Sequence, residues 1–100
     1  MTAEHRLYPQ GEIDLAVAPR LLEECLAEIG EHEPDLLVLD LADVTFLDAQ
    51  GLSLIATLHN RQAERGHRVV LTNVSPLLRR ILRATRLRNL VRIVDSERLG

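Results

Sequence analysis

The chain has 100 residues, of which 46% are apolar and 27% are charged, and this balance predicts one globular domain and excludes a disordered chain. Its single cysteine, Cys25, excludes a disulfide within the chain, and the two aromatic residues, Tyr8 and Phe46, are too few for a surface that stacks on nucleic-acid bases. The net charge of −3 divides into an acidic first half and a basic second half, and all twelve basic side chains are arginine.

Strands alternate with helices along the chain. In order, the apolar spacing predicts a kinked edge strand over 7–15, a helix over 18–29 that ends at Gly30, a buried strand over 36–41, a short strand over 44–47 and a helix over 51–65 that ends at Gly66. A strand over 68–72, a helix that starts at Ser75-Pro76, a strand over 91–94 and a final helix capped by Asp95 or Ser96 follow. The alternation predicts a single α/β domain over 1–100, with a mostly parallel sheet of four to five strands flanked by helices.

The stretch DVTFLDAQGL, residues 43–52, places a carboxylate and a glycine where a strand passes into a helix. The first turn of a helix leaves backbone N–H groups unpaired and carries partial positive charge, so Asp48 is predicted to cap this helix. Gly51 is predicted to let the helix start pass close to a neighbouring segment. Because the same N–H groups favour negative charge, the stretch is also a candidate recognition site for a phosphate-bearing group.

The motifs of common catalytic and metal sites are missing. The four histidines form no HxxxH pair, Cys25 has no CxxC partner, and the chain has neither a glycine-rich phosphate loop nor a nucleophile elbow. Paired carboxylates such as Asp40 and Asp43 fit solvated turns better than a catalytic pair. We therefore expect no catalytic residue, no metal site, no cofactor and no enzymatic activity.

An arginine-rich stretch without acidic residues lies near the C-terminus. It contains Arg79, Arg80, Arg83, Arg86, Arg88 and Arg92. We favour a solvated helix face for it, then contact with an acidic protein, and nucleic acid last, because the chain is acidic overall and poor in aromatic residues. No nucleic-acid partner is predicted.

The motif at 43–52 resembles that of STAS domains, the anti-sigma factor antagonist family. In that family an apolar strand end is followed by Asp-Ser-Ser-Gly-Leu, which this sequence matches at Asp48, Gly51 and Leu52. Gly11-Glu12-Ile13-Asp14 is similar to the family's Gly-Glu-Leu-Asp, and the segments 36–46 and 68–76 fit its central and later strands. The resemblance covers roughly residues 7–96 and implies a STAS-like domain.

The resemblance implies a regulatory protein that binds a partner and catalyses nothing. In the family, a kinase-like anti-sigma factor phosphorylates the second serine of the motif with ATP, and the unphosphorylated antagonist binds that factor and releases the sigma factor. Here the two serine positions fall on Ala49 and Gln50, and neither has a hydroxyl to accept a phosphate. The implied partner-binding residues are Asp14, Asp48, Ala49, Gln50, Gly51 and Leu52.

The glutamine at position 50 leaves three roles open. As a neutral residue it would keep the domain permanently able to bind, which we favour; as a bulky polar residue it would weaken binding; or the domain serves another task. The nearest hydroxyls are those of Thr45 and Ser53.

Two other functions are compatible with the sequence, namely a STAS subunit of a lipid ABC-type transport system and a sensor of small anions or nucleotides. The N-terminal MTAEHRLYPQ lacks an apolar signal core, and the longest aliphatic run covers only 36–39. We therefore expect a cytoplasmic protein without direct membrane insertion. A partner or a second copy of the chain, in a homodimer, would cover an exposed sheet edge.

Overall fold

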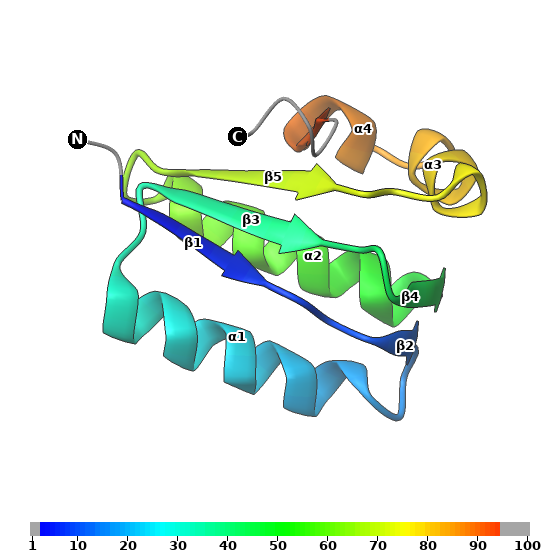
Figure 1. Ribbon diagram of the computed structural model, residues 1–100, viewed down its shortest axis with the longest axis horizontal. Coiled ribbons are helices and arrows are strands. Elements are labelled where there is room, and N and C mark those ends of the chain that lie inside the picture. The colour runs from blue at the N-terminus through cyan, green and yellow to red at the C-terminus, as the bar shows by residue number, and fades with distance from the viewer. Residues whose placement is uncertain (1–2, 95–100) are drawn as a thin grey trace.

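The computed structural model describes residues 3–94 (Figure 1). The strands are β1 (Glu4–Leu7), β2 (Gly11–Ile13), β3 (Leu36–Asp40), β4 (Val44–Leu47), β5 (Arg68–Thr72) and β6 (Arg92–Val94). The helices are α1 (Ala18–His32), α2 (Ala49–Ala63), α3 (Pro76–Arg83) and α4 (Leu87–Leu90).

Four strands form a parallel sheet in the order β1-β3-β5-β6. Strands β2 and β4 form a separate parallel pair, which lies beyond the ends of β1 and β3 (Figure 1). The predicted α/β class with a mostly parallel sheet is confirmed, and so is the edge position of the first strand. Parallel strands require crossover connections, and α1 and α2 supply two of them.

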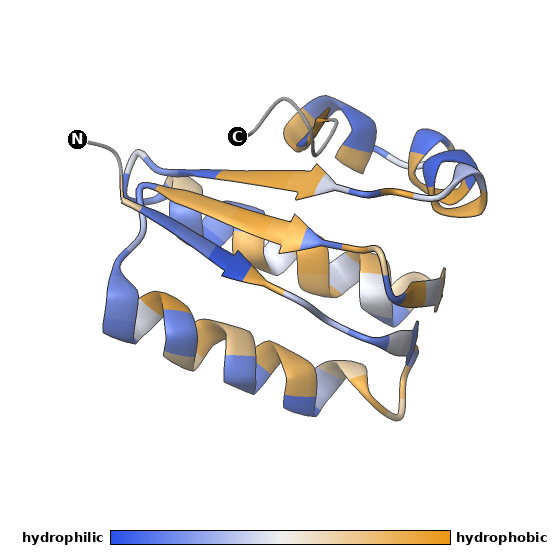
Figure 2. Cartoon of the chain, viewed as in Figure 1, coloured by the Kyte–Doolittle hydropathy of each residue, from blue (hydrophilic) through white to orange (hydrophobic). Residues whose placement is uncertain are grey.

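The core is aliphatic and lies between the sheet and the helices. Leu37 and Leu39 of β3 and Val69 and Leu71 of β5 point into it, and Figure 2 shows both strands as hydrophobic along most of their length. Each of the described helices contributes buried residues to the same cluster: Ala18, Cys25, Ile29, Leu54, Ile55, Leu58, Leu78, Leu82 and Leu87. Val38, on the other face of β3, is also fully buried, as expected for a central strand.

The first predicted strand, over 7–15, is instead divided between two sheets. β1 pairs with β3 while β2 pairs with β4, because the chain bends between them at Pro9 and at Gly11, whose φ is +75°. A positive φ is easy for glycine, and proline cannot donate a ladder hydrogen bond, so this segment cannot run as one continuous strand.

The end of α1 was also predicted wrongly. Gly30 lies within the helix, which continues to His32 and stops at Glu33 in the left-handed conformation. The N–H group of Glu33 still bonds to the carbonyl of Ile29, and Pro34 follows. Proline disfavours helical backbone in the residue before it, so Pro34 decides the stop.

Other helix boundaries follow local signals more closely. Ser75 caps α3 by accepting a hydrogen bond from the N–H group of Leu78, as its place before Pro76 predicted. The short helix α4 was not expected, and the predicted cap at Asp95 or Ser96 lies outside the described residues. Within residues 3–94, no helix combines the length and the apolar character needed to cross a membrane.

Candidate functional site

Asp48 holds the beginning of α2 in place. Its backbone is extended, with φ −96° and ψ −169°, and its Oδ1 accepts hydrogen bonds from the N–H groups of Gln50 at 2.8 Å and Gly51 at 3.1 Å. Its Oδ2 accepts a third bond, from the N–H group of Leu15 at 3.1 Å. The predicted cap is confirmed, and the same carboxylate also connects the helix to the loop after β2.

The β2–β4 pair brings two distant sequence segments together. Ile13 is in register with Leu47, and the carbonyl of Ile13 accepts a hydrogen bond from the N–H group of Asp48 at 3.3 Å. Next to this pair, Asp14 accepts bonds from the N–H groups of Ala16 and Val17 at 3.0 and 3.1 Å. The segments 11–14 and 48–52 therefore form one surface, in which Asp14 shapes the turn that leads into α1.

Gly51 lies where two backbones approach each other. A Cβ atom at this position would lie 2.6 Å from the carbonyl oxygen of Ile13 and 2.9 Å from Cδ2 of Leu47. The close approach predicted for this glycine is confirmed, and it keeps α2 pressed against β2 and β4.

The predicted partner-binding residues differ in how far they reach solvent. Ala49 and Gln50 are exposed at the helix tip, Asp48 and Leu52 are half-buried, and Gly51 is buried. A docked protein would therefore meet Ala49 and Gln50 directly, while Gly51 supports the backbone beneath them. The hydroxyl-bearing Thr45 and Ser53 are exposed near the tip.

Exposed apolar side chains that we had not predicted lie on segments next to this tip. Leu15 is 66% exposed, Val17 and Phe46 are each 42% exposed, and Leu77 is 47% exposed. Leu15 and Val17 belong to the turn held by Asp48 and Asp14, and Phe46 lies on β4. Leu77 is the second residue of α3, which packs beside β4. Exposed apolar side chains around one feature are typical of a protein-binding surface.

A groove of about 200 Å³ runs beside Gln50, between residues 18–22 of α1 and residues 50–57 of α2. It is lined by Ala18, Pro19 and Leu22 from α1 and by Gln50, Ser53, Leu54 and Thr57 from α2. None of these side chains is acidic, basic or thiol-bearing, so the groove offers shape and hydrogen bonds and no general acid, general base or activated nucleophile.

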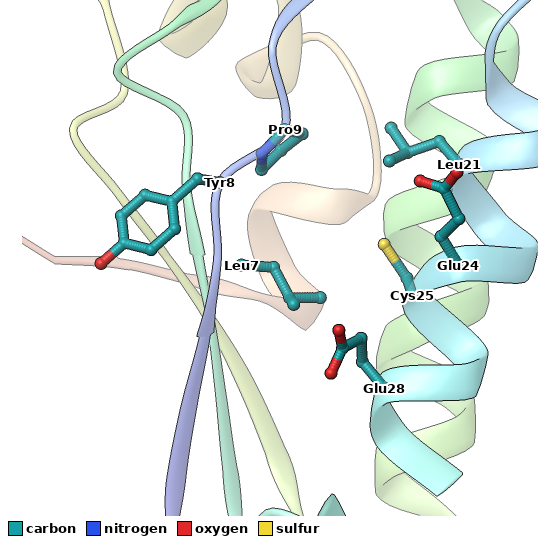
Figure 3. Close-up of a pocket in the computed structure, with 7 residues that line it drawn as sticks. All are labelled: Leu7, Tyr8, Pro9, Leu21, Glu24, Cys25 and Glu28. Carbon is teal, nitrogen blue, oxygen red and sulfur yellow. The ribbon is translucent and has the colours of Figure 1, made fainter. Parts of the chain in front are cut away.

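A second groove, of about 170 Å³, lies between the end of β1 and α1 (Figure 3). Cys25 and Glu28 line it opposite Leu7. Burial, with a smaller contribution from the carboxylates of Glu24 and Glu28, raises the pKa of the Cys25 thiol to about 11. The thiol is therefore protonated at neutral pH and is a poor nucleophile.

The sequence and the structure are similar to those of known proteins. The model of the STAS domain family matches residues 6–99. A putative anti-sigma factor antagonist from Thermotoga maritima superposes with a TM-score of 0.86 at 23% identity, covering 96% of this chain and 84% of the other. An anti-sigma factor antagonist from Mycobacterium paratuberculosis gives 0.80 at 26% identity and covers 91% of this chain and 76% of the other. A sulfate transporter family protein from Wolinella succinogenes gives 0.75 at 22% identity, covering 94% and 79%.

We expect Gly51→Ala to destabilise the fold by about 1–3 kcal/mol, because the new methyl group would overlap the carbonyl of Ile13. Gly30→Ala is the matched control, since Gly30 is helical and has no atom within 4 Å of the added Cβ. That variant should gain about 0.5–1 kcal/mol from helix propensity. Urea unfolding followed by circular dichroism measures both, and an unchanged or raised stability of Gly51→Ala would contradict the close packing.

We expect Asp48→Ala to cost about 2–3 kcal/mol, because one substitution removes a helix cap and the bond to the turn at Leu15. Asp43→Ala is the control, since the Asp43 carboxylate is exposed and has no bonding partner among the described residues. Amide hydrogen exchange should speed up at Leu15, Gln50 and Gly51 in the first variant only. Equal effects of the two substitutions would show that Asp48 does not organise the site.

Proposed function

This chain belongs to the STAS domain family, and we propose that it is a regulatory module that binds a kinase-like anti-sigma factor without catalysing a reaction. The observation that carries the proposal is the exposed tip of α2, with Ala49 and Gln50 at its centre and four exposed apolar side chains on the neighbouring segments. The similarity to anti-sigma factor antagonists at 23% and 26% identity supports the class of partner.

The surface is rigid enough to serve as a docking face. Asp48 fixes the tip through three backbone hydrogen bonds, and Gly51 allows the tip to pack directly on β2. Ordering a flexible loop on binding would cost free energy, and a tip already held in place avoids that cost. Docking would bury Leu15, Val17, Phe46 and Leu77.

Charge on the neighbouring helix favours a partner with an acidic rim. α3 lies beside β4, and its Arg80 and Arg83 are exposed. Complementary charges at the rim of an interface speed up association and select the partner more than they add to affinity.

Gln50 gives the module a fixed binding state. A phosphate at position 50 would add close to two negative charges at the centre of the apolar surface, and phosphorylation of an interface disrupts binding in this way. The amide of Gln50 is neutral and cannot accept a phosphate on oxygen, so we propose that the domain binds its partner permanently. We place the interaction in the cytoplasm of a bacterial cell.

We expect no phosphate on the wild-type chain after incubation with ATP and candidate kinase-like anti-sigma factors, and one phosphate on Gln50→Ser. The substitution restores a hydroxyl at the exposed second position of α2, where helix N–H groups favour the charge. Intact-protein mass spectrometry measures the mass increase expected of one phosphoryl group, about 80 Da.

Two control variants decide where the phosphate goes. Ser53→Ala in the Gln50→Ser background should leave the modification in place, and Thr45→Ala should do the same. A phosphorylated wild type would contradict the fixed state and direct attention to Ser53 or Thr45. If the wild-type chain binds none of the candidate anti-sigma factors, the proposed function itself is contradicted.

A second candidate is a subunit of a membrane transport system, which the likeness to the sulfate transporter family protein favours. In that role the same apolar tip would contact another subunit of the transporter. Purified candidate anti-sigma factors and soluble domains of candidate transporter subunits can be compared in one titration. Binding to the transporter domain alone would replace the first candidate by the second.

A further inference from the structure

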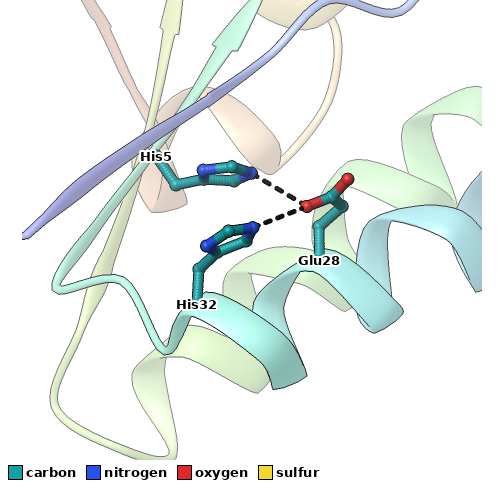
Figure 4. Close-up of side chains that lie close together, drawn as sticks. All are labelled: His5, Glu28 and His32. Atoms are coloured by element: carbon teal, nitrogen blue, oxygen red, sulfur yellow. Dashed lines mark hydrogen bonds and ion pairs between the residues drawn. The ribbon is translucent and has the colours of Figure 1, made fainter.

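Two histidines and one glutamate meet at the end of α1 that lies away from the docking face. His5 comes from β1, while Glu28 and His32 lie one turn apart on α1 (Figure 4). The Nε2 atoms of both histidines are 3.1 Å from the same oxygen, Oε2 of Glu28. The two rings are stacked, with centroids 4.1 Å apart and planes inclined by 21°.

Against the expectation from the sequence that the chain has no metal site, we propose that His5, Glu28 and His32 form a binding site for a divalent transition-metal ion of the Zn²⁺ class. Two imidazole nitrogens and one carboxylate oxygen are a ligand set that such ions prefer over Mg²⁺ or Ca²⁺. One ligand atom from each residue lies within 4.8 Å of the others.

The separations fit a tetrahedral ion after a small adjustment. With metal–ligand bonds of about 2.0–2.2 Å, ligand atoms in a tetrahedral site lie about 3.3–3.5 Å apart. The 3.1 Å separations to Glu28 are already close to this value. The stacked rings must turn so that both nitrogens face one point, and His32, with 43% of its side chain exposed, has room to do so.

A bound metal ion would take the place of any proton on the two Nε2 atoms. Nε2 of His5 is at hydrogen-bonding distance from Oε2 of Glu28, and Nε2 of His32 forms an ion pair with the same oxygen when its ring is protonated. A bound ion needs the lone pair on Nε2, so each neutral ring moves its proton to Nδ1, or loses one proton if it was charged. The negative charge of Glu28 offsets one of the two charges of the ion, and water would complete the coordination.

Cys25 lies one turn before Glu28 on the same helix but is no ligand in this arrangement. Its sulfur is buried in the groove beside Leu7, and it lies outside the cluster of converging ligand atoms. Its protonated thiol would also have to ionise before binding a metal.

The proposed ion would fasten the edge of the sheet to a helix. β1 pairs on one side only, with β3, so its attachment is weaker than that of the inner strands. An ion between His5 and α1 would hold this strand in place without touching the α2 tip. The site is therefore independent of the proposed partner binding.

The chain without any affinity tag can be tested with Zn²⁺ alone by calorimetry and with Co²⁺ alone by visible absorption. We expect one ion per chain, the absorption bands of tetrahedral Co²⁺ and a higher melting temperature with Zn²⁺. His5→Gln, Glu28→Gln and His32→Gln should each weaken binding by at least about tenfold. His59→Gln, at a half-buried histidine on α2, and Cys25→Ala are controls that should leave the affinity unchanged.

Circular dichroism confirms that each variant is folded before its affinity is compared. NMR of the wild-type chain gives a readout that needs no variant, because Zn²⁺ should shift the ring signals of His5 and His32 and leave those of His59 and His67 in place. Absence of binding at millimolar Zn²⁺, an octahedral Co²⁺ spectrum typical of solvated ions, or equal shifts at all four histidines would overturn the proposal.

Discussion

The carboxylate of Asp48 is the contact on which the candidate site depends. It accepts hydrogen bonds from the N–H groups of two successive residues of α2 and of one residue in the loop after β2. One side chain therefore fixes a helix start and a turn that are far apart in sequence. Gly51 complements it by letting the helix approach the carbonyl of Ile13. Together they turn an ordinary helix N-terminus into a surface of defined shape, on which the exposed residues 49 and 50 have fixed positions.

The proposed function separates binding from switching. The residues that hold the tip, Asp48 and Gly51, agree with the STAS motif, whereas the resemblance places the family's phosphate acceptor at Gln50. The apolar side chains around the tip supply a driving force for association that does not depend on the residue at position 50. A STAS domain with glutamine at position 50 can keep its docking face while losing regulation by phosphorylation. The metal site proposed at His5, Glu28 and His32, at the other end of α1, would change the stability of the fold in a different way, through binding of an ion.

Local sequence signals predicted the elements that depend on local chemistry. The caps at Asp48 and Ser75, the role of Gly51, the aliphatic central strands and the α/β class are all confirmed. The pairing of β2 with β4 escaped prediction because it joins residues more than thirty positions apart. The end of α1 beyond Gly30 followed a local signal, Pro34, that the prediction had overlooked. The exposure of Leu15 and the meeting of His5 with Glu28 depend on tertiary context. Periodicity cannot reveal such contacts, since each segment satisfies its own pattern regardless of its neighbours.

The most direct measurement of the central claim is an NMR titration of the isotope-labelled chain with a purified anti-sigma factor that it binds. We predict that the largest changes in amide signals fall on the first turn of α2, on the turn at 15–17 and on β4. These segments adjoin Gln50 and carry three of the four exposed apolar side chains, Leu15, Val17 and Phe46. Changes confined to α4, to β6 or to the C-terminal half of α1, with the α2 tip unaffected, would contradict the assignment of the docking face.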